Sequence, residues 1–344
     1  MVTIREIAEL ADVSTTTVSN VINGKTGHVS QSVIERVEKL LREYRYVPPM
    51  GLRVLSKGNS KIIGVVSFST KHFDATMQAD PFYGAVIGTV EQKINEAGYY
   101  MMLYSASSVE GIFRLVQAWN VDGILAITFG ERDCAKLREM TDKPLVTIDL
   151  NGTPPESVVN IGLDDFGGCY DMTQYLIRCG YRKIYTFTPN NTGNMGTDKS
   201  RYLGFKKAMQ DSGLPVSEEN LIALANTQEL RARQYEDYIK RMKKNDALFF
   251  FSDYCAIEAI SFLIDHHVAV PGDVGVAGFD DIIQASLFHP KLTTVRQSFQ
   301  KKAELAAESL IRMLDGEPVE NRNIILPTEI VVRQSTQILY GVSL

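Results

Sequence analysis

The chain has 344 residues, of which 44% are hydrophobic and 22% charged, and its mean hydropathy is −0.08. This length and balance predict a globular protein of two or three domains with a sizeable core. They exclude a membrane-spanning design, because no stretch offers the roughly 18 consecutive apolar residues that cross a bilayer. The N-terminal MVTIREIAEL lacks the apolar segment of a signal peptide, so we expect a cytoplasmic protein.

Charge is divided unevenly along the chain. Residues 1–60 hold eight Lys/Arg and six Asp/Glu, against 28 and 35 in the remainder, and the whole chain carries −5. A mildly basic N-terminal region followed by an acidic remainder indicates that the two parts have different functions. Only the N-terminal region has a net charge that favours nucleic-acid binding.

Metal or redox chemistry is not indicated. The four cysteines are scattered and form no C-x-x-C pair, which favours reduced, partly buried thiols. His266 and His267 are neighbours in sequence, and neighbouring positions of a helix face different ways. We therefore expect no metal and no cofactor.

The first 47 residues predict a helix-turn-helix domain. Thr3 and Glu6 fit a capping box, and apolar residues follow at helical spacing until residues 12–14 break the helix. A second helix ends at Asn23-Gly24, and a third starts near Ser30. Two short helices joined by a tight turn, closed by a third, are typical of this DNA-binding motif.

The second helix, within VSTTTVSNVING (13–24), is rich in hydroxyl side chains that are poor helix formers. Its valines place an apolar stripe on one side, so the short polar side chains face outward and can enter the major groove. The alternative is a solvated polar face in a small three-helix domain. We expect base contacts from Thr15, Thr16 and Asn20, phosphate contacts from Ser14, Thr17 and Ser19, and further DNA contacts from Thr3 and Asn23.

The motifs T-I-x-x-I-A, V-S-x-x-T-V-S-x-V-I-N-G, V-S and Y-x-P together cover nearly all of residues 3–55. This stretch resembles the DNA-binding head of LacI/GalR-family transcription regulators. Asn20 stands where the family usually has Arg, at a position that helps to read the operator. The resemblance implies a hinge at 48–60 that orders on DNA, with Arg53 near the phosphates and Leu55 wedged into the minor groove. The alternative for 48–60 is an ordinary linker, and Leu52 replaces the family's usual small residue there.

The body, residues 61–344, alternates apolar runs with helical patterns, which predicts parallel sheets covered on both faces. The strand count favours two doubly wound lobes. The predicted strands are 62–68, 99–104, 121–127, 144–150, 158–163, 183–189, 246–252, 274–280 and 292–297.

The body also resembles the family's effector-binding core, on the segments NIGLDDFGG, LIRCGYRKI, SRYLGFKKAM, DVGVAGFDD and HPKLTTVRQ. That core is similar to a periplasmic sugar-binding protein, with two lobes joined by three crossovers. We expect the crossovers near 162–164, 292–294 and 326–328. The N-lobe would then comprise 61–162 and 294–326, and the C-lobe 164–292 and 328–340.

An effector is expected between the lobes, at the carboxyl ends of the strands. Arg201 and Asp280 should face it from one lobe, and the aromatic residues from the other. Strand-end carboxylates also commonly cap helices, which is the alternative for Asp253 and Asp281. The predicted effector-binding residues are Phe82, Tyr83, Asp149, Arg201, Ser252, Asp253 and Asp280.

Two departures from sugar-binding relatives bear on the ligand. Ser252-Asp253 stands where they commonly have Asn-Asp, and the segment 69–84 is longer than usual and could partly fill the cleft. The predicted effector is a sugar, a sugar phosphate or a nucleobase.

The sequence therefore predicts a DNA-binding transcription regulator, most simply a repressor, that binds double-stranded operator DNA as a homodimer. A solute-binding protein is disfavoured by the DNA-binding head. An enzyme is disfavoured because G-x-G-x-x-G, G-x-x-x-x-G-K-[ST] and H-E-x-x-H are all missing, so no catalytic residue is expected. An alternative mode of control is a protein corepressor that docks on the N-lobe. The C-terminal STQILYGVSL has no leucine heptad, which favours a dimer over a tetramer.

Overall fold

The computed structural model describes residues 2–46, 59–68, 81–189 and 196–339. The chain divides into two compact units, Met1–Ser60 and Lys61–Leu344, which we call the head and the body. Most of the predicted hinge, including Arg53 and Leu55, lies outside the described residues, as does most of segment 69–84.

The described residues of the head form three helices: α1 (Ile4–Leu10), α2 (Thr15–Ile22) and α3 (Gln31–Glu43). The predicted capping box is confirmed, since the Thr3 hydroxyl accepts from the backbone N–H of Glu6 and the Glu6 carboxylate accepts from that of Thr3 at 2.7 Å. A small apolar core holds the helices together. It is formed by Ile7, Ala8, Ala11, Val18, Val21 and Val37.

The described part of the body forms two six-stranded sheets, and all nine predicted strands are present. The first sheet, the N-lobe, is parallel with the order β11-β5-β4-β3-β1-β2. Its strands are β1 (Ile62–Phe68), β2 (Tyr100–Ala106), β3 (Gly123–Ile127), β4 (Leu145–Ile148), β5 (Val158–Leu163) and β11 (Asn323–Leu326). Its helices are α5 (Pro81–Glu96), α6 (Val109–Trp119), α7 (Glu131–Met140) and α13 (Phe299–Leu314).

The second sheet, the C-lobe, has the order β12-β10-β9-β8-β6-β7 and is parallel except for β12. Its strands are β6 (Ile184–Thr188), β7 (Leu221–Ala223), β8 (Asp246–Phe250), β9 (Val274–Asp280), β10 (Thr293–Arg296) and β12 (Glu329–Val331). Its helices are α8 (Asp165–Arg178), α9 (Thr197–Asp211), α10 (Gln228–Arg241), α11 (Asp253–Asp265) and α12 (Ile283–Leu287), with a 3₁₀ turn at Glu218–Asn220.

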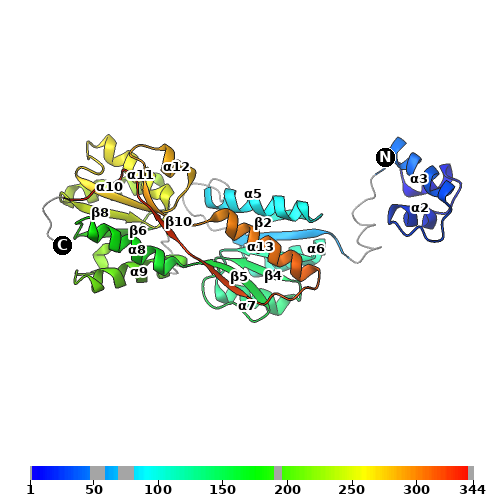
Figure 1. Ribbon diagram of the computed structural model, residues 1–344, viewed down its shortest axis with the longest axis horizontal. Coiled ribbons are helices and arrows are strands. Elements are labelled where there is room, and N and C mark those ends of the chain that lie inside the picture. The colour runs from blue at the N-terminus through cyan, green and yellow to red at the C-terminus, as the bar shows by residue number, and fades with distance from the viewer. Residues whose placement is uncertain (1, 47–58, 69–80, 190–195, 340–344) are drawn as a thin grey trace. The chain divides into compact units, whose positions relative to one another are not determined.

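Each sheet is covered on both faces, which explains why its strands are apolar at successive positions. In β1, Ile63 and Val65 pack in the core with α5 and α13, whereas Ile62 and Val66 pack in the core with α6 and α7. Figure 1 shows α5 and α13 side by side in the N-lobe. The predicted fold class, a three-helix head and a body of two doubly wound lobes, is confirmed.

The chain passes between the lobes three times. The first passage lies between β5 and α8, and the third lies between β11 and β12. The second was predicted at 292–294 and is wrong by about four residues. Residues 293–296 form β10, which pairs with β9 in the C-lobe sheet, so the chain crosses at Gln297–Ser298.

All four cysteines are buried free thiols, as predicted. Burial raises the pKa of Cys134 to about 11, which keeps this thiol protonated and unreactive. Among the described residues, no helix is both long and apolar enough to cross a bilayer.

Candidate functional site

The outer face of α2 is the first candidate site. Val18 and Val21 are buried in the head core, whereas Thr15 and Thr16 are exposed and Asn20 is half-buried. The helix is thus divided into an apolar inner face and a polar outer face, as its sequence predicts. The side chains of Thr15, Thr16 and Asn20 form no hydrogen bond with the described residues, so their polar groups remain available to another molecule.

Other predicted DNA-binding residues also hold the helix ends. Ser14 is the N-cap of α2, and its hydroxyl accepts from the backbone N–H of Thr17 at 3.0 Å. At the other end, the side-chain amide of Asn23 donates to the carbonyl of Ser19 at 2.8 Å. Thr3 caps α1. These hydroxyls and amides stabilise the helices that present Thr15 and Thr16.

The second candidate site lies between the lobes, where the carboxyl ends of the strands carry polar side chains. Asp149 directly follows β4, Asp280 ends β9, and both are 9% exposed. Phe82 and Tyr83 lie in the first turn of α5, and Arg201 lies on α9. Hydrogen bonds through Lys302 and Gln297 link Asp149 of the N-lobe to Asp280 of the C-lobe. Phe82 lies beside Lys302, and Arg201 lies near Asp280.

Arg201 is buried on α9, one turn inside the helix, and is not the surface residue that an Arg near a helix start usually is. Its Nε donates to Asp165 at 2.7 Å and its Nη1 donates to the carbonyl of Phe251 at 2.6 Å, while Asp198 lies 3.7 Å away. Burial opposes its charge, but the surrounding carboxylates outweigh burial and raise its pKa. The guanidinium is therefore fixed and charged, stacked 3.8 Å above the ring of Phe279.

Asp165 is a site residue that sequence reasoning missed. In the pair Asp164-Asp165, the first carboxylate caps α8 by accepting from Gly167 at 2.8 Å, and the second turns inward to Arg201. Burial raises the pKa of Asp165 above its usual range, and the Coulomb effect of Arg201 only partly offsets this. Two adjacent acidic residues thus have different roles, which their spacing alone does not reveal.

Lys302 is the second missed residue, and it is fully buried on α13. Its ammonium donates to both carboxylate oxygens of Asp149, at 2.7 and 2.8 Å, and to the amide oxygen of Gln297 at 2.7 Å. Gln297 in turn donates to Asp280 at 2.6 Å. The sequence did contain a signal, because Lys302 falls within the apolar stripe of its helix, where a lysine needs a partner.

Aromatic rings line the N-lobe side of this group. The Phe82 ring lies 5.6 Å from that of Phe299, edge to face, and 5.6 Å from the Lys302 ammonium. The Tyr83 hydroxyl lies 2.7 Å from that of Thr128. The predicted aromatic residues and Asp149 are therefore brought together, with Lys302 between Phe82 and Asp149.

Three strand ends here have unusual backbone conformations. The φ angles of Thr128, Asp149 and Asp280 are +56°, +54° and +128°, in the region that side chains other than glycine rarely adopt. Such residues cost on the order of 1–3 kcal/mol each and cluster at binding sites, where surrounding bonds hold them. The Lys302 and Gln297 bonds hold two of the three.

Asp253, a predicted effector-binding residue, is held by hydrogen bonds inside the C-lobe. It is 0% exposed, and its carboxylate accepts from the backbone N–H of Ile282 at 3.0 Å and from the Thr294 hydroxyl at 2.5 Å. These bonds join α11 to the segment after β9 and to β10, so the role of Asp253 is structural. Ser252, the N-cap of α11, is half-buried.

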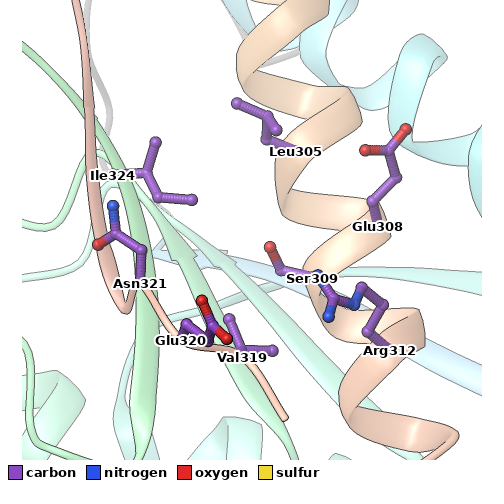
Figure 2. Close-up of a pocket in the computed structure, with 8 residues that line it drawn as sticks. All are labelled: Leu305, Glu308, Ser309, Arg312, Val319, Glu320, Asn321 and Ile324. Carbon is purple, nitrogen blue, oxygen red and sulfur yellow. The ribbon is translucent and has the colours of Figure 1, made fainter. Parts of the chain in front are cut away.

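A separate pocket lies on the N-lobe, and none of the predicted site residues lines it. Figure 2 shows α13 on one side and the segment leading into β11 on the other. The pocket volume is about 410 Å³. Its lining residues are Leu305, Glu308, Ser309, Arg312, Val319, Glu320, Asn321 and Ile324.

Two features together define a class of protein. One is a helix-turn-helix head whose second helix offers unbonded polar groups, and the other is a two-lobed body with charged side chains between its lobes. It is a DNA-binding transcription regulator with a ligand-binding type of body. Residues 3–49 match the model for bacterial regulatory proteins of the lacI family, and residues 173–336 match that for periplasmic binding protein-like domains.

Curated relatives share the full length. The HTH-type transcriptional repressor PurR of Actinobacillus pleuropneumoniae serotype 3 (strain JL03) is 30% identical, with 98% of this chain and 99% of PurR covered. The HTH-type transcriptional regulator DegA of Bacillus subtilis (strain 168) is 28% identical, with 97% and 98% covered. The chain belongs to the lacI family of bacterial regulatory proteins.

Solved structures agree with this assignment. The transcriptional regulator CelR in complex with cellobiose is 27% identical, with a TM-score of 0.70 and coverage of 97% of this chain and 100% of CelR. The lac repressor dimer bound to operator and the anti-inducer ONPF has a TM-score of 0.82 at 22% identity, with 98% and 99% covered, and shares the fold.

The structural role of Asp253 predicts a pH-dependent stability. Burial raises its pKa to about 7, from an ordinary value of 3.8. Its carboxyl therefore stabilises the fold fully only below about pH 4, and this contribution is lost as the pH rises through about 7. Asp253→Asn cannot ionise. Its amide oxygen can accept from Ile282 and its amide nitrogen can donate to the Thr294 hydroxyl, so at pH 8 it should be more stable than the wild type, by on the order of 1–2 kcal/mol.

Urea denaturation of the full chain at pH 5 and pH 8 measures this effect. The difference should shrink at pH 5, and Asp265→Asn, an exposed residue on the same helix, should change little at either pH. An Asp253→Asn variant that is less stable than the wild type at pH 8 would contradict the assigned role.

Proposed function

We propose that this regulator is a repressor that binds its operator through α2 and releases or retains it in response to a small molecule held between the lobes. The observation that carries the proposal is that Asp149 of one lobe and Asp280 of the other are joined through Lys302 and Gln297. The Phe82 ring lies 5.6 Å from the Lys302 ammonium, and Asp280 is one of the carboxylates that raise the pKa of Arg201. Ligand binding between lobes biases their arrangement, and that bias can reach the DNA-binding heads.

On DNA, we propose that Thr15, Thr16 and Asn20 contact bases, while Ser14, Thr17 and Ser19 lie nearer the phosphates, with Thr3 and Asn23 at the ends of the surface. The lack of side-chain bonds at the first three residues supports this division. Short side chains let a helix lie deep in the major groove, where donor and acceptor patterns differ between base pairs.

For the hinge, we propose that Leu55 enters the minor groove at the operator centre and that Arg53 contacts phosphates, on the strength of the family resemblance. An apolar wedge unstacks a base step and kinks the duplex. Unchanged operator bending by Leu55→Ala, measured by gel mobility of circularly permuted duplexes, would rule out this role.

We also propose that the protein acts in the cytoplasm as a homodimer on a two-fold symmetric operator, because one head this small buries too little surface for tight specific binding. The C-lobe supports self-association, since Ile283 and Leu287 on α12 are each 67% exposed and Tyr254 on α11 is 41% exposed. Sedimentation of a monomer at concentrations that saturate the operator would contradict this.

The predicted effector is a sugar, a sugar phosphate or a nucleobase, and the charged side chains between the lobes favour some of these over others. Among the described residues, four buried carboxylates surround two cations, and Lys302 already uses its three donors. A phosphate there would meet unfavourable repulsion, whereas hydroxyl or ring N–H groups can donate to carboxylates. We therefore favour a neutral sugar or a nucleobase. The relative CelR was solved with cellobiose, which supports the first.

A second candidate mode of control is a protein corepressor on the N-lobe. The pocket between α13 and the segment leading into β11 supports it, since both apolar and charged side chains line it (Figure 2). We favour the small molecule because the group between the lobes has more buried and directed polar contacts. We propose no catalytic role, metal or cofactor.

The DNA-contact proposal predicts a loss of specificity in Thr16→Ala and Asn20→Ala. Each should lose on the order of 1–3 kcal/mol of affinity for an operator selected from random duplexes, with nonspecific affinity nearly unchanged. Fluorescence anisotropy on both duplexes measures this. Tyr44→Phe, exposed at the end of α3, is the control. Equal losses on both duplexes would mean that α2 does not read bases.

The effector proposal predicts that Asp280→Asn uncouples the regulator from its ligand. We avoid Arg201→Ala, because it would leave Asp165 and Asp198 without their cation and destabilise the C-lobe. Asparagine keeps an oxygen for Gln297 but loses the charge. Operator binding should persist, while the response to the active compound in a panel of sugars, sugar phosphates and nucleobases weakens at least tenfold, the cost of about one polar contact.

Asp171→Asn, exposed on α8 of the same lobe, is the matched control and should respond like the wild type. If Asp280→Asn also responds like the wild type, the effector binds elsewhere. Control that needs a protein partner and survives Asp280→Asn would favour the N-lobe corepressor.

A further inference from the structure

A continuous row of four buried polar side chains joins the two lobes. We call it the interlobe tie: Asp149, Lys302, Gln297 and Asp280. Asp149 and Lys302 belong to the N-lobe, Asp280 ends β9 of the C-lobe, and Gln297 lies at the second crossing between β10 and α13. Its four bonds measure 2.6–2.8 Å, and no member is more than 9% exposed.

The bonds of the tie determine which way the side-chain amide of Gln297 is oriented. The Lys302 ammonium has only donors, and three of them are used: two on Asp149 and one on the Gln297 amide oxygen. The amide nitrogen of Gln297 must then face Asp280, to which it donates. Both ends of the amide are thereby used, one toward each lobe.

Burial makes these bonds consequential. An unpaired ammonium or carboxylate in this setting would be strongly unfavourable, so Lys302 remains buried only while Asp149 compensates it. Hydrogen bonds to charged groups are stronger than neutral ones. Movement of Asp280 away from Gln297 would cost a charge-assisted bond at the point where the lobes are joined.

We propose that Lys302 and Gln297 are positioning residues, which hold the strand-end carboxylates Asp149 and Asp280 in place and keep the lobes in one arrangement in the absence of ligand. The tie restricts the lobe arrangement in the protein without ligand. Only its consequence for regulation rests on the proposed function: a ligand that bonds to Asp280 competes with Gln297 and thereby alters the lobe arrangement.

The test measures the distance between the lobes in the unliganded full chain. Spin labels are placed at Glu139→Cys on α7 and Gln210→Cys on α9, both exposed, while the native cysteines are buried. Double electron–electron resonance then reports the distribution of distances. The doubly labelled chain is mixed with an excess of unlabelled chain, so that a homodimer contributes only distances within one chain. The unaltered tie should then give one narrow population.

Gln297→Glu is the primary variant because it matches the wild-type side chain in size. It keeps an oxygen for Lys302 but places a second carboxylate against Asp280, so it breaks the tie on the C-lobe side only. The equilibrium between lobe arrangements should shift by about tenfold or more, which appears as a second or broadened distance population. Lys301→Met, the exposed neighbour of Lys302, is the control and should match the wild type.

Lys302→Met alone would leave Asp149 unpaired and could unfold the N-lobe. The double variant Lys302→Met/Asp149→Asn removes both charges, and asparagine tolerates the positive φ of residue 149. It should melt cooperatively and show the same broadened distances as Gln297→Glu.

Wild-type distances in both Gln297→Glu and the folded double variant would overturn the proposal. The tie would then only compensate buried charge and would not determine the lobe arrangement. Because no ligand is present, this outcome is distinct from failure of the effector proposal. That failure would appear as an intact tie combined with an unchanged response of Asp280→Asn.

Discussion

The structure of the body depends on one constraint: charged side chains are buried between the lobes, where the parallel strands of the two sheets have their carboxyl ends. Strand ends in such sheets carry polar side chains, and two lobes that face each other must desolvate them. Here Arg201 is compensated by carboxylates within the C-lobe, whereas Lys302 is compensated by Asp149 and Gln297. The second group spans both lobes, so the same bonds that satisfy buried charge also determine how the lobes meet.

This arrangement connects stability with function. A site that held its charged groups only within one lobe could bind a ligand without moving the other lobe. Because Gln297 bonds to Lys302 on one side and Asp280 on the other, any molecule that changes these bonds has differential affinity for the lobe arrangements. The head differs: its core holds the three helices together, and Thr15, Thr16 and Asn20 on the outer face of α2 form no side-chain hydrogen bond with the described residues.

The sequence predicted most of the fold, since buried parallel strands and amphipathic helices have strong periodic signals. It missed β7, β11 and β12, which are short and partly exposed, and it misplaced the crossing at Gln297 because β10 continues through Arg296. The site was predicted in part. Carboxylates at strand ends can be recognised in the sequence because they directly follow apolar runs. The partners of buried charges cannot, because they come from distant segments: Lys302 lies 153 positions from Asp149. For Asp253, only the structure shows where its oxygens bond.

The central claim is that the head and the group between the lobes are thermodynamically coupled, and hydrogen–deuterium exchange of the full chain with and without operator tests it most directly. Linkage is reciprocal, so operator binding must change the lobe equilibrium if the lobes control operator binding. We expect altered exchange in the head and also in residues 145–150 and 293–302, which carry the interlobe tie. Changes confined to residues 1–60 would contradict it.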